Sequence, residues 1–235
     1  MLLIHEEHRV RVGHEHELEH CYRDGWAKNL AGSNFARLLW YFDQATGTGR
    51  SNVVVTVTAV PDFEAWQELD QRVRHGELSD WQRDVEGHRH SARGKLLEPA
   101  YWSPLQDVNL ATVPSGQEEH PVSIYMEDTG WPWPPLEDYV RFNDEMYFQI
   151  MGQAPADQKL LDIQGFFTTV WGAGRSLESL FMQKVLDYNQ LIRLLAVPER
   201  YDPDVWPGSY MVQGLKYRDQ WRSRLLRTSP WSPYF

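Results

Sequence analysis

The stretch Gly47-Thr48-Gly49-Arg50-Ser51 recurs later in the chain as Gly172-Ala173-Gly174-Arg175-Ser176. In each copy an acidic and an aromatic residue follow, twelve residues after the arginine, as Asp62-Phe63 and Asp187-Tyr188. The run Val53 to Val60 after the first turn is rich in β-branched residues, which is typical of a strand. A recurring segment decides the fold, because each copy is expected to form the same supersecondary unit.

Other matching groups of residues flank these turns, in the same order in both halves of the chain. Three short groups in the first half pair with three in the second: Ile4 and Glu7 with Ile124 and Glu127, Leu18-Glu19 and Arg23 with Leu136-Glu137 and Arg141, and Leu96-Leu97 and Trp102-Ser103-Pro104 with Leu225-Leu226 and Trp231-Ser232-Pro233. The sequence therefore predicts a tandem duplication. The expected units are residues 1–105 and 122–235, and residues 106–121, which contain Pro114-Ser115-Gly116, are the expected linker.

Hydrophobic periodicity predicts the order β-α-β-β-α-β in each copy, which is the ferredoxin-like unit. The expected elements of the first unit are a strand at Leu2 to Val12, a helix at His14 to Leu30, strands at Phe35 to Asp43 and Val53 to Val60, a helix after Pro61 with Asp62 as N-cap, a helical piece holding Trp81 and a strand at Lys95 to Tyr101. Those of the second are a strand at Val122 to Glu127, a helix at Leu136 to Ile150, strands at Leu160 to Trp171 and Leu177 to Val185, a helix after Asp187 and a strand near Arg224.

The composition excludes several classes of protein. The 235 residues are 42% hydrophobic and 24% charged, which is ordinary for a globular protein, and the net charge is −10. An acidic surface argues against nucleic acid and anionic membranes as partners. A single cysteine, Cys21, excludes internal disulfides and a cysteine-rich metal site. The first residues do not form a signal peptide and no apolar run reaches membrane-spanning length, so a cytoplasmic location is expected.

A strand ending in Arg9-Val10-Arg11-Val12-Gly13, followed by an acidic amphipathic helix, resembles the dimeric α/β barrel superfamily. It is most similar to the NIPSNAP-like and antibiotic-monooxygenase-like branches, although the usual proline before the glycine is Val12 here. The resemblance implies an α+β fold in which two ferredoxin-like units pack sheet to sheet around a lumen that holds the ligand. Here both units lie in one chain, as in chlorite-dismutase-like members, so we expect a pseudo-dimeric α/β barrel.

Side chains alternate along a strand, so Leu2, Ile4, Val10 and Val12 are expected to face the helices. The other face carries His5, Glu7 and Arg9 into the lumen, and the second copy adds Tyr125 and Glu127. Two facing carboxylates in a dry cavity raise one pKa, which suits acid/base catalysis. The predicted catalytic residues are His5, Glu7, Tyr125 and Glu127. The alternative is that both glutamates are paired with arginines at the barrel rim, as structural residues.

Further residues are candidates for binding substrate. Arg50 and Arg175 could clamp a carboxylate or phenolate, or could be exposed hairpin residues. The loop Trp131-Pro132-Trp133-Pro134-Pro135 is a candidate lid over an apolar cavity. Most tryptophans are expected in the core. The predicted substrate-binding set is Arg9, Trp40, Arg50, Trp131, Trp133, Trp171 and Arg175.

Metal and haem sites are the alternatives to a site without a cofactor. His16-Glu17-Leu18-Glu19-His20 matches a zinc-protease pattern, but the buried Leu18 places both histidines on the opposite side of the helix. The second copy has no histidine pair there. Haem-binding relatives use an axial histidine in the C-terminal half, whereas no histidine follows His120, which leaves only His5 or His75. We therefore expect no cofactor, and treat zinc at His16 and His20, and haem, as alternatives.

The sequence thus predicts an enzyme for a hydrophobic aromatic, terpenoid or polyketide-like small molecule, using acid/base chemistry in the lumen. The resemblance implies a cofactor-independent monooxygenase, a cyclase or an isomerase. One alternative is a non-catalytic ligand-binding NIPSNAP-like module, whose lumen would be filled by side chains. Another is a metal- or haem-dependent enzyme using the histidine-rich first unit. The internal pseudo-dimer removes the need for a homodimer without forbidding one.

Overall fold

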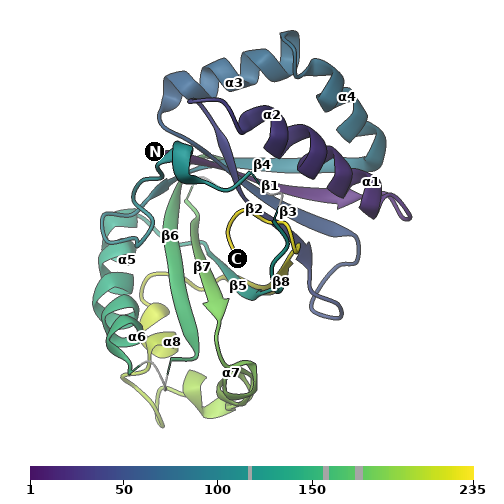
Figure 1. Cartoon of the computed structure of the whole chain (residues 1–235). Coiled ribbons are helices and arrows are strands. Elements are labelled where there is room, and N and C mark those ends of the chain that lie inside the picture. The colour runs from purple at the N-terminus through teal and green to yellow at the C-terminus, as the bar shows by residue number, and fades with distance from the viewer. Residues whose placement is uncertain (116–117, 156–158, 173–176) are drawn as a thin grey trace.

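The computed structural model describes residues 1–115, 118–155, 159–172 and 177–235, and shows two β-α-β-β-α-β units (Figure 1). The first consists of β1 (Leu2–Val10), a continuous helix formed by α1 (Glu15–His20), η1 (Cys21–Ala27) and α2 (Lys28–Leu30), then β2 (Arg37–Gln44), β3 (Val53–Val60), α3 (Phe63–His75), α4 (Ser79–His88) and β4 (Arg89–Pro99). The second, after η2 (Leu110–Thr112), consists of β5 (Ile124–Gly130), the helix of α5 (Leu136–Asn143), η3 (Asp144–Phe148) and α6 (Gln149–Gln153), β6 (Leu161–Gly172), β7 (Ser179–Val185), α7 (Tyr188–Leu195), η4 (Pro198–Tyr201), α8 (Tyr210–Gly214) and β8 (Trp221–Thr228).

The strands close into one antiparallel barrel in the order β1-β3-β2-β8-β5-β7-β6-β4. The two units meet at two seams, where β8 pairs with β2 and β4 pairs with β6. In each case the last strand of one unit extends the sheet of the other. The predicted pseudo-dimeric α/β barrel is therefore the observed fold, and Figure 1 shows the helices of each unit on the outside of the ring of strands.

The repeated Trp-Ser-Pro motif stabilises these seams, because the serine and tryptophan of each copy contact the other unit. Ser103 Oγ accepts a hydrogen bond from Phe166 N of the second unit (3.0 Å), and Ser232 Oγ accepts one from Tyr41 N of the first (3.1 Å). The indole of Trp102 packs in the helix-side core of the second unit, and that of Trp231 packs in that of the first. The duplication seen in sequence is thus also a reciprocal packing arrangement.

The alternation predicted for β1 is present. Leu2, Ile4 and Val10 belong to the core under the first helices, whereas Leu3 lies in the lumen core. Val12 departs from the prediction, because β1 ends at Val10 and the chain turns at Gly13 with φ of +84°. Val12 therefore lies outside the sheet and is 81% exposed.

The long helix of each unit contains a π-helical segment at a corresponding place, η1 in the first and η3 in the second. Such segments widen the helix locally and are frequent near functional sites.

Asp62 caps α3, as expected, by accepting a hydrogen bond from Ala65 N (2.8 Å). In the described part of the chain, no helix combines the length and apolar character that crossing a membrane requires.

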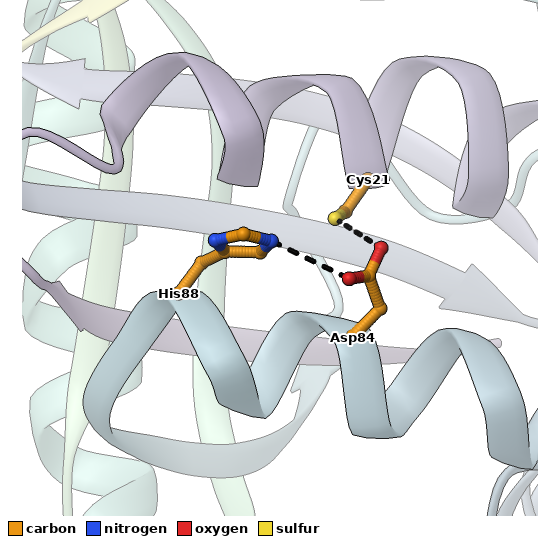
Figure 2. Close-up of side chains that lie close together, drawn as sticks. All are labelled: Cys21, Asp84 and His88. Atoms are coloured by element: carbon orange, nitrogen blue, oxygen red, sulfur yellow. Dashed lines mark hydrogen bonds and ion pairs between the residues drawn. The ribbon is translucent and has the colours of Figure 1, made fainter.

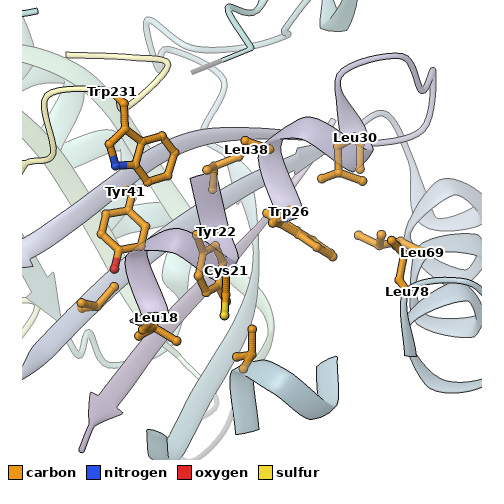
Figure 3. Close-up of a cluster of buried hydrophobic side chains, with 14 of the residues drawn as sticks. Leu18, Cys21, Tyr22, Trp26, Leu30, Leu38, Tyr41, Leu69, Leu78 and Trp231 are labelled. Carbon is orange, nitrogen blue, oxygen red and sulfur yellow. The ribbon is translucent and has the colours of Figure 1, made fainter. Parts of the chain in front are cut away.

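Figure 3 shows the core beneath α1 and η1. At its edge the backbone of Gly25 lies close to the ring of Trp81. Trp26 and Trp81 stack with ring centroids 4.2 Å apart, and Trp81 Nε1 donates to the carbonyl of Cys21 (2.8 Å). A Cβ added at Gly25 would lie 2.6 Å from Trp81 Cδ1. The glycine is therefore required by packing and not by its backbone angles.

Gly25→Ala is accordingly expected to destabilise the protein by about 1–3 kcal/mol, the usual cost of overpacking a core. Gly87→Ala in α4 is the control, since an added Cβ there meets nothing within 4 Å. It should stabilise the protein by up to about 1 kcal/mol, because alanine favours the helix. Urea unfolding followed by tryptophan fluorescence measures both, and equal effects of the two variants would contradict the packing argument.

Candidate functional site

The predicted lumen residues form a network of charges. His5 Nε2 lies 2.8 Å from Glu127 Oε2, and Arg224 Nε donates to Glu127 Oε1 at 2.8 Å. The same guanidinium donates through Nη1 to Glu7 Oε2 at 2.5 Å, while the exposed Arg222 lies 3.6 Å from Glu7. The structure therefore brings His5, Glu7 and Glu127 together, but with an arginine between the two carboxylates.

This arginine overturns the expected pKa. Burial alone would raise the pKa of Glu127, but Arg224 and His5 lower it far below its ordinary value. Burial also opposes ionisation of Glu7, yet Arg224 and Arg222 lower its pKa as well. The prediction that one glutamate has a raised pKa was wrong, because β8 delivers a cation that compensates both charges. The arrangement matches the structural ion pairs considered as the alternative.

The lumen offers little space for a substrate. Trp40 and Tyr125 are almost fully buried in an apolar core together with Phe42, Phe167 and Leu226. Side chains of the connecting segment, such as Val108 and Val113, and Tyr234 near the C-terminus complete the packing. An opening beside His5, Glu7 and Lys95 has a volume of about 110 Å³, whereas sites for drug-sized ligands usually exceed about 300 Å³.

The other predicted binding residues are scattered. Arg9 and Arg50 are exposed, the latter in the hairpin between β2 and β3. Trp131 Nε1 donates to Glu178 Oε1 (3.1 Å), and Lys95 Nζ donates to the other oxygen of this carboxylate, Oε2 (2.9 Å). Trp133 is 45% exposed. The side chain of Trp171 and the whole of Arg175 lie outside the described residues.

The candidate metal and haem residues do not come together. The side chain of His16 is 93% exposed, and that of His20 is 63% exposed and lies 2.9 Å from Asp24. For haem, His5 is packed against Glu127 in the filled lumen and His75 is exposed at the end of α3. The opening beside His5, about 110 Å³, is too small for a macrocycle, and His75 lies at the surface.

A more spacious cavity lies in the second unit, between its sheet and its helices. Its volume is about 430 Å³, and apolar groups dominate its wall. η3, β6, β7, α7 and the segment around α8 contribute side chains, so the helix layer forms one side and the outer face of the sheet the other. The apolar and aromatic lining residues are Met126, Tyr139, Met146, Tyr147, Ile150, Met151, Leu161, Phe181, Leu191, Leu195, Tyr201, Trp206, Tyr210, Met211 and Trp221.

One carboxylate lies in this wall. Asp128 projects from β5 on the face opposite Glu127, as strand alternation requires. Gln183 Nε2 donates to Asp128 Oδ2 (2.9 Å), and the hydroxyl of Tyr147 in η3 donates to Gln183 Oε1 (2.6 Å). Burial raises the pKa of Asp128, although Arg218 and Gln183 partly oppose the shift. A raised pKa was predicted for one of the lumen glutamates, and it occurs at Asp128 instead.

One cation lies in the same wall. Arg218 is only 5% exposed, and its Nε donates to the Tyr139 hydroxyl at 2.6 Å. Its guanidinium lies 4.6 Å from the ring centroid of Trp221. Among the described residues its close contacts are hydroxyls and aromatic rings, and no carboxylate lies within ion-pair distance. Gly130 makes room for this group, since a Cβ there would lie 3.0 Å from Tyr139 Oη and 3.2 Å from Arg218 Cδ.

The corresponding space in the first unit is filled. His8 follows Glu7 as Asp128 follows Glu127, and it bonds Thr56 Oγ1 (3.0 Å), the Tyr22 hydroxyl (3.2 Å) and Arg89 Nη1 (2.8 Å). Tyr22 and Trp26 occupy the space under the helix. Sequence reasoning missed Asp128 and Arg218, although a polar residue on the helix-facing side of a strand was the available signal.

No protein-family model and no curated protein matches the sequence. Solved structures of similar fold include a protein from Lactobacillus acidophilus NCFM named as a candidate monooxygenase, with 7% identity, a TM-score of 0.58, and coverage of 96% of this chain and 93% of that one. An anthrone oxidase-like protein is 8% identical, with a TM-score of 0.56 and coverage of 97% of this chain and 91% of that one. A NIPSNAP-domain protein from Burkholderia xenovorans is 22% identical and aligns with 44% of this chain and 99% of that one, with a TM-score of 0.37.

The comparisons at full length span both units of this chain in single proteins, in agreement with the barrel order and its two seams. At these identities they establish the fold. This chain therefore has the fold of the dimeric α/β barrel superfamily, with both ferredoxin-like units in one polypeptide.

Proposed function

We propose that this protein binds a hydrophobic aromatic compound in the cavity of the second unit and transfers a proton to or from it through Asp128. The observation that supports this most directly is the placement of one carboxylate of raised pKa in the wall of an apolar cavity of about 430 Å³. Groups with perturbed pKa values in clefts are frequent at functional sites. The proposal keeps the predicted acid/base chemistry and moves it from the lumen to the outer face of the second sheet.

The wall also indicates the class of ligand. Its aromatic and methionine side chains favour a flat apolar molecule, since sulfur and π-surfaces pack well against rings. Arg218 adds a buried positive charge whose direct contacts are neutral, so a phenolate or carboxylate on the ligand could pair with it at close range. The proposed substrate is thus an aromatic compound with one acidic group.

The chemistry proposed for Asp128 is proton abstraction from such a compound. The ionised carboxylate would accept the proton, and Arg218 would stabilise the negative charge left on the ligand. The link from Tyr147 through Gln183 holds Oδ2 in place. Proton abstraction from an acidic carbon is a first step available to the monooxygenase, cyclase and isomerase reactions that the resemblance implies.

Binding is tested first with the fluorescent aromatic anion 8-anilinonaphthalene-1-sulfonate. We expect one molecule per chain, and Arg218→Met should weaken binding by about 10- to 100-fold, because a charged hydrogen-bonding partner is lost. Met211→Trp, which fills the cavity, should also abolish it. The controls are Arg222→Met and Val12→Trp, which change exposed residues, and both should bind the anion as the wild type does. Unchanged binding in both Arg218→Met and Met211→Trp would exclude this cavity.

Proton transfer is tested with anthrone, an aromatic carbon acid, chosen because one structure of similar fold is named anthrone oxidase-like. Incubation in D₂O without oxygen should exchange its carbon-bound protons faster in the presence of the protein, as followed by NMR. Repeating the incubation under air separates oxidation from exchange alone. Binding without exchange for anthrone and related acidic aromatics would favour the non-catalytic binding module.

A further inference from the structure

Three side chains with metal-binding atoms lie close together between η1 and α4 of the first unit (Figure 2). Cys21 lies at the start of the π-helical segment η1, and Asp84 and His88 lie one turn apart on α4. The thiol of Cys21 donates to Asp84 Oδ2 at 3.2 Å, and His88 Nε2 lies 3.4 Å from Asp84 Oδ1. Residues 63 positions apart in the sequence therefore present sulfur, oxygen and nitrogen to one point.

The spacing of these atoms suits a tetrahedral ion. Sulfur, carboxylate oxygen and imidazole nitrogen all lie within 4.8 Å of one another. Zinc bonds of about 2.0–2.3 Å at tetrahedral angles place ligand atoms about 3.3–3.8 Å apart. The three ligand atoms are therefore close to those separations before any ion is bound.

A fourth residue orients the histidine. His14 Nδ1 lies 2.9 Å from His88 Nδ1, on the side of the ring away from Asp84. One of these nitrogens must carry the proton that they share. If His88 donates it, Nε2 of His88 is left as a lone pair directed at the cluster. Histidines that bind metals usually donate their other ring nitrogen in this way.

We propose that Cys21, Asp84 and His88 form a binding site for a divalent transition-metal ion, with zinc the metal that fits these donors best. A thiolate and a carboxylate together neutralise a dipositive ion, and a mixed sulfur, nitrogen and oxygen set is common for zinc and disfavours magnesium and calcium. The side chain of Asp84 is 66% exposed and that of His88 is 19% exposed, so the ion can enter from solvent.

The site joins η1 to α4 and is distinct from the histidines of the zinc-protease pattern. In the described part of the chain the cluster supplies three ligands, which leaves the fourth tetrahedral position to water or another exchangeable ligand. The single cysteine of the chain is therefore sufficient, because aspartate and histidine provide the other donors.

Cobalt provides the decisive measurement, because Co²⁺ takes zinc sites and its bond to thiolate gives an intense near-ultraviolet charge-transfer band. Protein prepared without a His-tag, treated with EDTA and then freed of it, should bind one Co²⁺ per chain and show this band. Added Zn²⁺ should displace the cobalt. Cys21→Ser should lose the band, and His14→Gln should weaken Zn²⁺ binding by about 10- to 100-fold, as removal of an orienting partner does.

Asp84→Asn keeps the test valid if Cys21→Ser fails to fold, since the exposed side chain of Asp84 makes that variant safe for folding. It should weaken Zn²⁺ binding by at least the roughly 10- to 100-fold that loss of an orienting partner causes, while leaving the circular dichroism spectrum unchanged. The control is His16→Gln/His20→Gln, which should bind Co²⁺ as the wild type does. Absence of binding, binding without the thiolate band, or binding lost only in the His16/His20 variant would each overturn the proposal.

Discussion

Replacing Arg224 by methionine is expected to lower the free energy of unfolding by about 3–5 kcal/mol at neutral pH. The side chain of Glu127 is fully buried and that of Arg224 is 6% exposed, so the variant leaves a buried carboxylate without its main counter-charge. Methionine keeps much of the volume of arginine, which limits the cavity term. Urea unfolding at about pH 7 measures the difference.

Acid should shrink this difference. The folded-state pKa values of Glu127 and Glu7 lie below their ordinary value of 4.5, so the stability that they contribute is present above that pH and is lost as the pH falls through the lower folded values. In Arg224→Met the carboxylates lose that depression of their pKa. Wild type and variant should therefore converge in stability as the pH falls below about 4.5.

Arg222→Met is the matched control for Arg224. Its side chain is 47% exposed and lies 3.6 Å from the same Glu7 oxygen. Such a pair contributes less than about 1 kcal/mol. If both variants were equally stable, the buried network would have no special part in holding the two units together.

Asp128→Asn is expected to slow proton exchange into the bound carbon acid by about 100- to 10,000-fold, the usual contribution of a positioned general base. Binding of the fluorescent anion should persist, because asparagine has the same shape and Arg218 is untouched. In the wild type, burial raises the pKa of Asp128, so the basic form accumulates at higher pH than for a free aspartate. The exchange rate should rise with pH through that raised value and then level off.

Glu7→Gln separates this proposal from a site in the lumen. Glu7 lies at the small lumen opening, and its pKa is lowered by Arg224 and Arg222 although burial opposes this, so it is a weak base. Exchange should proceed in this variant as in the wild type. Loss of exchange in Glu7→Gln with retention in Asp128→Asn would return the chemistry to the lumen glutamates.

Much of the fold follows from local patterns. The run Val53 to Val60 is β3 in full, and the helix predicted at His14 to Leu30 spans Glu15 to Leu30. Alternation along β1 sorted Leu3 and His5 from Leu2 and Ile4, because a strand has only two faces. The repeat itself predicted a second unit able to cover the open face of the first sheet.

The electrostatics of the lumen depended on contacts that no local pattern reports. Arg224 reaches Glu7 across 217 residues, through the pairing of β8 with β2 at one seam. From sequence alone the two glutamates faced each other. The arginine that lies between them is fixed only when the barrel closes, and it reverses the sign of the expected pKa shift.

The sequence by itself determined the two β-α-β-β-α-β units, their order and the faces of their strands, because backbone geometry ties these features to short-range periodicity. Only the tertiary structure decided where cavities remain and which polar or charged side chains line them. Tyr22 and Trp26 fill the helix side of the first unit, while the matching region near Asp128 stays open. Cavities and side-chain clusters depend on how whole layers pack, and packing joins residues whose spacing in the chain carries no signal.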